Sequence, residues 1–412
     1  MDAMKKEAWW DTGMYWVLLL LAVASNLSTG ATSFAIGIGA LLMIVQSIKT
    51  RQLPKIDKGL GKVILLYLLL WCIVAAHSAE PARSFGDVWA TAYRFLPLFF
   101  AMIYIRRPEH LKGFFIAFVC SVLINDLYAL QQVITKPAYR PTGFNNTATF
   151  LASHMLMAIP VALLAARQIF FSKHIRWMMA GIGVLSFAVL VLSETRGGWV
   201  AFAVVCIVFA LLGKGYRKRA LMGMGIIAVL FVISCTVYGP FQTRVMSITD
   251  PTHQTNTERI LMWRSAVEIV KDYPILGIGQ DEFAYYYNAK YISPLAKERG
   301  SAENPRDGHG HPHNNILKMA SEGGIVGLGA FLILHGYILY RLVCQYRKER
   351  WMKLSYALFG ILIFVGIQME GLTDTNINQV PIMREYWLLM GMVLIGGRVL
   401  EEGKTENCHS RE

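Results

Sequence analysis

The chain has 412 residues, of which 55% are hydrophobic and only 16% are charged. This composition is too apolar for a soluble enzyme and indicates a membrane protein. The formal net charge of +13 argues little for nucleic-acid binding, because most Lys and Arg residues lie in short connections between apolar runs and form no basic stripe with interleaved aromatic residues.

Apolar runs of roughly 17 to 25 residues recur along the chain, a length that crosses the bilayer as a helix. The sequence therefore predicts an all-α polytopic membrane protein with about twelve transmembrane helices and one large outer loop with short helices. We expect transmembrane helices in residues 1–238, the loop at 239–314, further transmembrane helices in 315–400 and a cytoplasmic tail at 401–412. The expected spans are 14–27, 33–48, 62–76, 85–105, 111–134, 147–166, 175–193, 198–213, 221–238, 316–343, 354–372 and 386–400.

Charge predicts the orientation of these helices, because Lys and Arg gather in cytoplasmic connections. Every second connection is rich in basic residues, and the connections between them carry few. This alternation places both termini in the cytoplasm and the loop at 239–314 on the outer side. The first apolar run, which ends near Ala24 and Ser25, could instead be a cleaved signal peptide. We favour a retained helix because little charge precedes this run.

A synthetic enzyme that acts outside the cytoplasmic membrane has no ATP or nucleotide sugar. Its energy must come from an activated bond already present in the membrane, and a lipid-linked pyrophosphate is such a donor. Arginine suits a diphosphate near a low-dielectric boundary, because the guanidinium stays protonated and forks onto phosphate oxygens. The arginines expected on the outer side are therefore candidates for binding the donor.

Arg196 lies in a Gly-containing connection expected between two spans, just before Gly197, Gly198 and Trp199. It could be a snorkelling side chain beside an aromatic interface anchor. It could also bind an anion, because an arginine is disfavoured on the outer side and the two glycines let backbone amides approach a ligand.

Arg259 and Arg264 fall on a helix expected from Thr257 to about Lys271, with Thr257 or Asn256 as its cap. Their spacing of five places them about 140° apart around the helix, so they need not share a ligand. A salt bridge to Glu258 or Glu268 is the alternative for either arginine.

His311, His313 and Asn314 precede the expected span at 316–343. A neutral histidine there could be a general base toward a sugar hydroxyl, and the nearby helix N-terminus favours phosphate. The His-Gly-His-Pro-His tract that begins at His309 could equally bind a metal ion or be a surface tract. The pattern alone does not choose between base, metal ligand and surface tract.

No Asp-x-Asp motif and no Cys-x-x-Cys motif is present, and the six cysteines lie outside the loop at 239–314. The sequence therefore predicts no disulfide and no cofactor, and apart from the histidine tract it gives no indication of a metal site. Pyrophosphate is a good leaving group, so cations and a base on the attacking hydroxyl are sufficient for its displacement.

At these motifs the sequence resembles the superfamily of O-antigen ligases and O-antigen polymerases, which are polytopic membrane glycosyltransferases. The similarity covers about residues 150–334, and the first third of the chain is similar in hydropathy only. The matching motifs are Thr195-Arg196-Gly197-Gly198-Trp199, Glu258-Arg259 with Trp263-Arg264, Pro274-Ile275-Leu276-Gly277-Ile278-Gly279, His311-Pro312-His313-Asn314 and Glu322-Gly323-Gly324-Ile325-Val326-Gly327.

The resemblance implies transfer of a glycan from undecaprenyl pyrophosphate on the periplasmic face of the bacterial inner membrane, without metal or ATP, with inversion at the anomeric carbon. It implies that Arg196, Arg259 and His313 are catalytic and that Arg264, His311 and Asn314 bind substrate. The additional His309 and His311 leave the choice of base between His311 and His313 open.

Members of the superfamily share the donor and differ in the acceptor. The resemblance is greatest to O-antigen ligases of lipopolysaccharide biosynthesis, whose acceptor is the lipid A-core. A repeat-unit polymerase or a protein O-oligosaccharyltransferase is the alternative. A lipid or polysaccharide transporter is the alternative from another class, although charged residues within the spans are sparse. The oligomeric state does not follow from the sequence.

Overall fold

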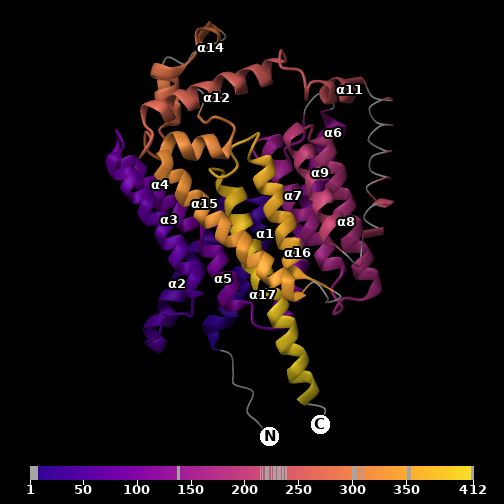
Figure 1. Cartoon of the computed structure of the whole chain (residues 1–412). Coiled ribbons are helices and arrows are strands. Elements are labelled where there is room, and N and C mark those ends of the chain that lie inside the picture. Colours follow the sequence, from indigo (N-terminus) through magenta and orange to yellow (C-terminus); the bar gives the residue numbers. More distant parts are fainter. Residues whose placement is uncertain are drawn as a thin grey trace.

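A computed structural model describes residues 8–136, 140–213, 239–298, 304–307, 310–349 and 354–409, together with scattered positions between 215 and 236. Every element in this part of the chain is a helix. Long helices lie side by side as a bundle, both termini lie at one end, and α12 (Gln254–Asp272) crosses the other end (Figure 1).

The helices fall into three groups along the chain, and apart from α12 those of residues 239–314 are short. The N-terminal part contains α1 (Trp9–Leu27), α2 (Thr29–Thr50), α3 (Lys58–His77), α4 (Pro81–Arg94), α5 (Leu96–Tyr104), α6 (Pro108–Thr135), α7 (Ala148–Ala166), α8 (Lys173–Leu192) and α9 (Arg196–Leu212). The segment 239–314 contributes α11 (Gly239–Met246), α12, α13 (Phe283–Tyr286), η2 (Tyr287–Tyr291), α14 (Pro294–Glu298) and η3 (Pro305–Asp307). The C-terminal helices are α15 (Asn315–Glu349), α16 (Tyr356–Glu370) and α17 (Val380–His409).

Among the described residues, α2, α3, α6, α7, α8 and α15 are long and apolar enough to cross a membrane, and α9 and α16 are shorter apolar helices. These helices agree with the expected class of polytopic membrane protein. The count of twelve spans stays a prediction, since the span expected at 221–238 lies mostly outside the described residues.

The single helix expected over 85–105 is wrong, because the structure has two helices there, α4 and α5, which meet at Phe95. Pro97 occupies the first turn of α5. Proline has no backbone N–H, and its ring clashes with the carbonyl four residues earlier, so a continuous helix through Pro97 would be strained. α4 is amphipathic rather than uniformly apolar, with Trp89 exposed and Val88 buried.

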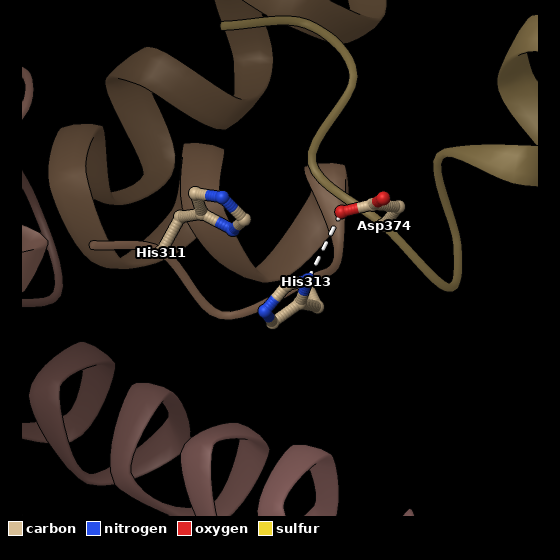
Figure 2. A group of neighbouring side chains, drawn as sticks. All are labelled: His311, His313 and Asp374. Carbon is tan, nitrogen blue, oxygen red and sulfur yellow. Dashed lines mark hydrogen bonds and ion pairs between the residues drawn. The ribbon is translucent and has the colours of Figure 1, made fainter. Parts of the chain in front are cut away.

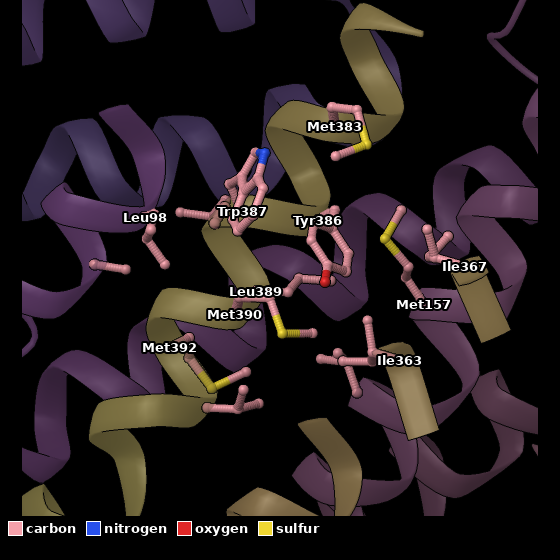
Figure 3. Close-up of a cluster of buried hydrophobic side chains, with 14 of the residues drawn as sticks. Leu98, Met157, Ile363, Ile367, Met383, Tyr386, Trp387, Leu389, Met390 and Met392 are labelled. Carbon is pink, nitrogen blue, oxygen red and sulfur yellow. The ribbon is translucent and has the colours of Figure 1, made fainter. Parts of the chain in front are cut away.

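The centre of the bundle is formed by α7, α16 and α17, whose side chains are buried around most of each helix. Such all-round burial fits the almost uninterrupted apolar sequences of α7 and α16. Figure 3 shows Tyr386, Trp387 and Met390 of α17 packed among side chains of neighbouring helices, such as Met157 of α7 and Ile363 of α16. This packing fixes the connector between α16 and α17, residues 371–379, which enters the candidate site.

Two of the sequence motifs, residues 274–279 and 322–327, bind each other through their backbones. Gly324 interrupts α15 with φ of 58° and ψ of −154°, which removes helical hydrogen bonds at that point. Residues 274–279 supply replacement partners. The bonds run from Ile278 N to Ser321 O (3.1 Å), Gly279 N to Glu322 O (2.9 Å), Ile325 N to Pro274 O (2.9 Å) and Val326 N to Ile275 O (3.2 Å).

We expect Gly324→Ala to destabilise the protein. A Cβ at Gly324 would lie 2.4 Å from the carbonyl carbon and oxygen of Ile275, and its positive φ disfavours any side chain. The cost should be about 1 to 3 kcal/mol from the backbone conformation alone. Thermal unfolding of the purified protein would measure it. Gly329→Ala, in the same helix with nothing within 4 Å of the added Cβ, should not lower the unfolding temperature, and an equal loss in both variants would contradict this account.

Candidate active site

Four arginines from distant parts of the sequence surround a small cavity at the end of the bundle that α12 crosses. They are Arg140, Arg196, Arg244 and Arg259, and the cavity, of about 90 Å³, is also lined by Glu370 and Asp374. A second cavity of about 300 Å³ shares Arg196, Gly197, Arg259 and Thr373 with the first. The two predicted catalytic arginines, Arg196 and Arg259, therefore meet at one place.

Arg196 begins α9 and is buried, with 8% of its surface exposed. Both terminal nitrogens of its guanidinium already donate hydrogen bonds. Nη1 donates to the backbone oxygen (2.5 Å) and the hydroxyl (2.9 Å) of Ser247, and Nη2 donates to Thr255 Oγ1 (2.7 Å) and Asn256 Oδ1 (2.8 Å). Arg196 thus ties the N-terminus of α9 to the beginning of α12.

Arg259 differs from Arg196, because within the described part of the chain its guanidinium has no hydrogen-bond partner. Burial lowers the pKa of Arg259, the negative charge of Asp374 raises it, and the positive charge of Arg244 lowers it. A half-buried arginine with free donors in a cavity is suited to bind an anion.

Arg140 and Arg244 add two further cations to the cavity. Arg140 donates to Ser193 O (2.9 Å) and Thr195 Oγ1 (3.0 Å), and Arg244 donates from Nε to Glu194 O (3.2 Å). Burial, with the charges of Arg244 and Arg259, lowers the pKa of Arg140 to about 10. The arginines repel one another, so a bound phosphate group would stabilise the whole cluster.

Arg264, which we predicted to bind substrate, is exposed and lines neither cavity. This agrees with its expected angular separation from Arg259. The alternative salt bridge to Glu268 is not formed, since Glu268 pairs with Lys271 at 2.8 Å. The substrate-binding role of Arg264 stays a prediction.

The predicted cap of this helix is wrong. The helix α12 begins at Gln254 rather than Thr257, and its N-cap residue, His253, makes no capping hydrogen bond through its side chain. Asn256 lies inside the first turn and uses its amide oxygen to accept from Arg196. Asn256 thus makes a contact between two helices instead of a local capping hydrogen bond. The sequence pattern of one helix does not reveal such a contact.

His313 is paired with Asp374, a residue of the connector between α16 and α17 (Figure 2). The distance from His313 Nδ1 to Asp374 Oδ1 is 2.9 Å, and the backbone N–H of Thr375 also donates to Oδ1 at 2.8 Å. Burial raises the pKa of Asp374, but the hydrogen bond and charge of His313 outweigh burial and lower this pKa to about 2. The ionised carboxylate holds the proton on Nδ1, which leaves Nε2 of His313 to accept a proton.

His311 lies against His313, with ring centroids 4.4 Å apart and the rings at 70°. Its Nδ1 is buried and has no hydrogen-bond partner among the described residues. Burial, reinforced by the positive charge of His313, lowers the pKa of His311 to about 4. His311 is therefore neutral at pH 7 but has no carboxylate hydrogen-bonded to its ring, which favours His313 over His311 as the base.

The depressed pKa of His311 predicts a pH dependence of stability. Between about pH 4 and 6.5 the unfolded chain binds a proton on this histidine and the folded protein does not, so stability falls as the pH is lowered through this range. We expect the unfolding temperature to decrease from pH 6.5 to pH 4, and to decrease less in His311→Gln. An equally steep decrease in that variant would refute the assignment to His311.

Asn314, predicted to bind substrate, uses its side chain to hold the local structure. Its Oδ1 accepts from Leu317 N at 3.0 Å, and its Nδ2 donates to Leu372 O at 2.9 Å. Trp263 of α12 donates to Pro312 O at 2.8 Å. These bonds fix the histidine tract between α12 and the connector 371–379. His309 lies outside the described residues.

A metal ion is the chemical alternative for this group of side chains. His311, His313 and Asp374 offer ligand atoms that all lie within 4.8 Å of one another, and two imidazoles with one carboxylate are a known zinc ligand set. The hydrogen bond between His313 and Asp374 also satisfies both groups without an ion. The geometry thus permits either a base or a metal ligand.

The sequence interpretation missed Arg140, Arg244 and Asp374 as members of the site. Asp374 lies in the polar run Thr373-Asp374-Thr375-Asn376 between two apolar helices, which is a signal that could have been noticed. Arg140 and Arg244 resemble ordinary loop arginines in the sequence. Only their approach to Arg259 in the fold distinguishes them.

Helices long and apolar enough to cross a membrane, with an arginine-lined cavity and a histidine–carboxylate pair at one end of the bundle, are features of a polytopic membrane protein with a cationic cavity. Residues 181–332 match the family model described as O-Antigen ligase, a range that contains Arg196, Arg244, Arg259 and His313. This match supports the resemblance to the O-antigen ligase superfamily that the motifs indicated.

Relatives of the chain agree with this placement. It is 20% identical over 360 residues to the protein named "Putative polysaccharide ligase RC0486" of Rickettsia conorii, covering 85% of this chain and 82% of the relative. It is 26% identical over 215 residues to a protein of the same description from Rickettsia typhi, covering 50% and 47%. An uncharacterized protein of Haemophilus influenzae is 21% identical over 293 residues, covering 68% and 71%.

Proposed function

We propose that the protein is an O-antigen ligase, which transfers a polysaccharide from undecaprenyl pyrophosphate to a lipid A-core acceptor. The reaction takes place on the periplasmic face of the bacterial inner membrane, with α11 to α14 on that side, and requires neither ATP nor a metal. One observation carries this proposal: an arginine cluster around a cavity lies beside a histidine oriented by a carboxylate.

The arginines divide into two roles in this proposal. Arg259 and Arg244 line the cavity, and within the described residues each has guanidinium nitrogens without a hydrogen-bond partner. They bind the diphosphate oxygens, which carry increasing negative charge as the glycosidic bond breaks. Arg196 supports this arrangement by holding α9 and α12 together through Ser247, Thr255 and Asn256, and it adds its charge to the same cavity.

The histidine activates the acceptor. Nε2 of His313 removes the proton from an acceptor sugar hydroxyl as its oxygen forms a bond to the anomeric carbon of the donor. The bond from that carbon to the diphosphate breaks on the opposite face, so the configuration inverts and undecaprenyl diphosphate leaves with the electron pair. Asp374 stabilises the imidazolium that forms, since its carboxylate lies 2.9 Å from Nδ1.

Purified protein with a lipid-pyrophosphate glycan donor and a lipid A-core acceptor would test the proposal directly. We expect a new covalent product that retains the glycan, and we expect EDTA to leave the rate unchanged, because the histidine–carboxylate pair is complete without an ion. Loss of activity in EDTA with recovery in Zn²⁺ would instead assign His311, His313 and Asp374 to a metal site. A transporter would move the substrate between compartments and yield no covalent product.

The acceptor decides between members of the superfamily. Deletion of the gene followed by gel electrophoresis of lipopolysaccharide distinguishes them: a core that lacks all O-chain indicates a ligase, and a core that carries a single repeat indicates a repeat-unit polymerase. Normal lipopolysaccharide with an unglycosylated protein acceptor would indicate a protein O-oligosaccharyltransferase.

A further inference from the structure

The larger of the two cavities is lined by both cationic and apolar side chains. Arg196 and Arg259 contribute two cations against the one carboxylate of Asp250, and Val200, Ile248 and Ile260 contribute apolar side chains. An anionic group bound by the arginines would therefore have an apolar surface beside it. This combination fits an amphiphile better than a free anion.

An exposed apolar stripe continues from this cavity down α9. Val200 is four residues after Arg196, so both lie on the same face of the helix. Ala203, Ile207 and Leu211 follow at spacings of three and four residues, and all four are exposed, with 45% for Val200, 51% for Ile207 and 65% for Leu211. The stripe thus begins at the cavity and runs along a helix of the bundle.

We propose that this stripe binds the polyprenyl chain of the lipid-linked donor, with the diphosphate at Arg259, which lines both cavities, and the first isoprene units in the larger cavity. This inference rests on the proposed function. The positive charge at the end of the stripe, and the continuity of the stripe with the cavity, identify the occupant as a lipid with an anionic head group. Ile207 lies about 16 Å from Arg196 along the helix axis, so a long lipid tail is needed to reach it.

A photoreactive side chain at position 207 tests the location without requiring catalysis. Full-length protein that carries p-benzoylphenylalanine in place of Ile207 is reconstituted in nanodiscs with radiolabelled undecaprenyl diphosphate and irradiated. The matched control places the same group at Val184 of α8, another exposed apolar position. We expect strong labelling at 207 and weak labelling at 184, and equal labelling at both positions would overturn the proposal.

Donor length provides a second, kinetic test. Val200→Ala with Ile207→Ala removes apolar contact with the chain and should raise KM for an undecaprenyl donor by about tenfold, with kcat unchanged. For a donor with a two-isoprene tail, the increase in log KM caused by the double substitution should be less than half as large, because this tail cannot reach Ile207. Val184→Ala is the control that should change neither KM.

The two tests separate this inference from the proposed function. If glycan transfer persists but KM changes equally for long and short donors, the stripe is not the binding site of the polyprenyl chain. Absence of transfer with every donor would reject the proposed function, whereas labelling by undecaprenyl diphosphate would still report whether the lipid lies on α9.

Discussion

Replacement of His313 by alanine is expected to lower kcat by about 10²- to 10⁴-fold, because it removes the proposed general base for the acceptor hydroxyl. Asp374→Asn should lower kcat by about 10²-fold, since an amide cannot stabilise the imidazolium through the 2.9 Å contact with Nδ1. KM for the lipid donor should change little in either variant. Single-turnover rates with purified protein, donor and acceptor would measure these effects.

The control for this pair is Asp272→Asn, which removes an exposed carboxylate of the same segment that pairs with Lys290. It should retain full activity. Undiminished transfer by His313→Ala would remove His313 from the role of base, and His311→Gln would then be the variant to examine.

Replacement of Arg259 by glutamine is expected to lower kcat/KM for the lipid-pyrophosphate donor by about 10- to 100-fold, the cost of losing charge-assisted hydrogen bonds to phosphate. The Arg259 side chain lines the cavity and has no hydrogen-bond partner in the described part of the protein. Its loss should therefore weaken donor binding rather than destabilise the fold. Arg244→Gln should behave in the same way. Steady-state kinetics over a range of donor concentrations would measure both.

Two further variants on the same helix make this test specific. Lys271→Gln removes an exposed cation that pairs with Glu268, and it should leave kcat/KM for the donor unchanged. Arg264→Gln tests the substrate-binding role predicted for Arg264, and a loss as large as that of Arg259→Gln would show that the donor extends beyond the two cavities. If Arg259→Gln has normal kcat/KM, the diphosphate does not bind at this cluster.

Arg196 illustrates how a sequence pattern can mark a residue without revealing its contacts. Its unusual position beside two glycines marked it in the sequence. In the structure its four hydrogen bonds hold Ser247, Thr255 and Asn256, which gives it a task in assembling the site as well as a charge within it. Hydrogen bonds between segments that are distant in sequence are not visible in local patterns.

The sequence by itself determined the class of protein and most of its helices. Apolar runs identify membrane-spanning helices because the bilayer forbids unpaired backbone groups, and the helices α6 to α9 lie where those runs predicted. It also singled out Arg196, Arg259 and His313 as candidate site residues, and their catalytic roles stay predictions. The hydropathy pattern concealed the break at Pro97 and the interruption of α15 at Gly324.

Only the tertiary structure decided which residues share a site. Arg140 and Asp374 come from connectors 234 residues apart in sequence, yet both line the cavity beside Arg259. The physical reason is that the apolar face of a helix determines that this face is buried, but not which helix covers it. The packing of α7, α16 and α17 therefore sets where each connector leaves the bundle. The partner of His313, the free guanidinium of Arg259 and the bonds that join residues 274–279 to the break at Gly324 all follow from that packing.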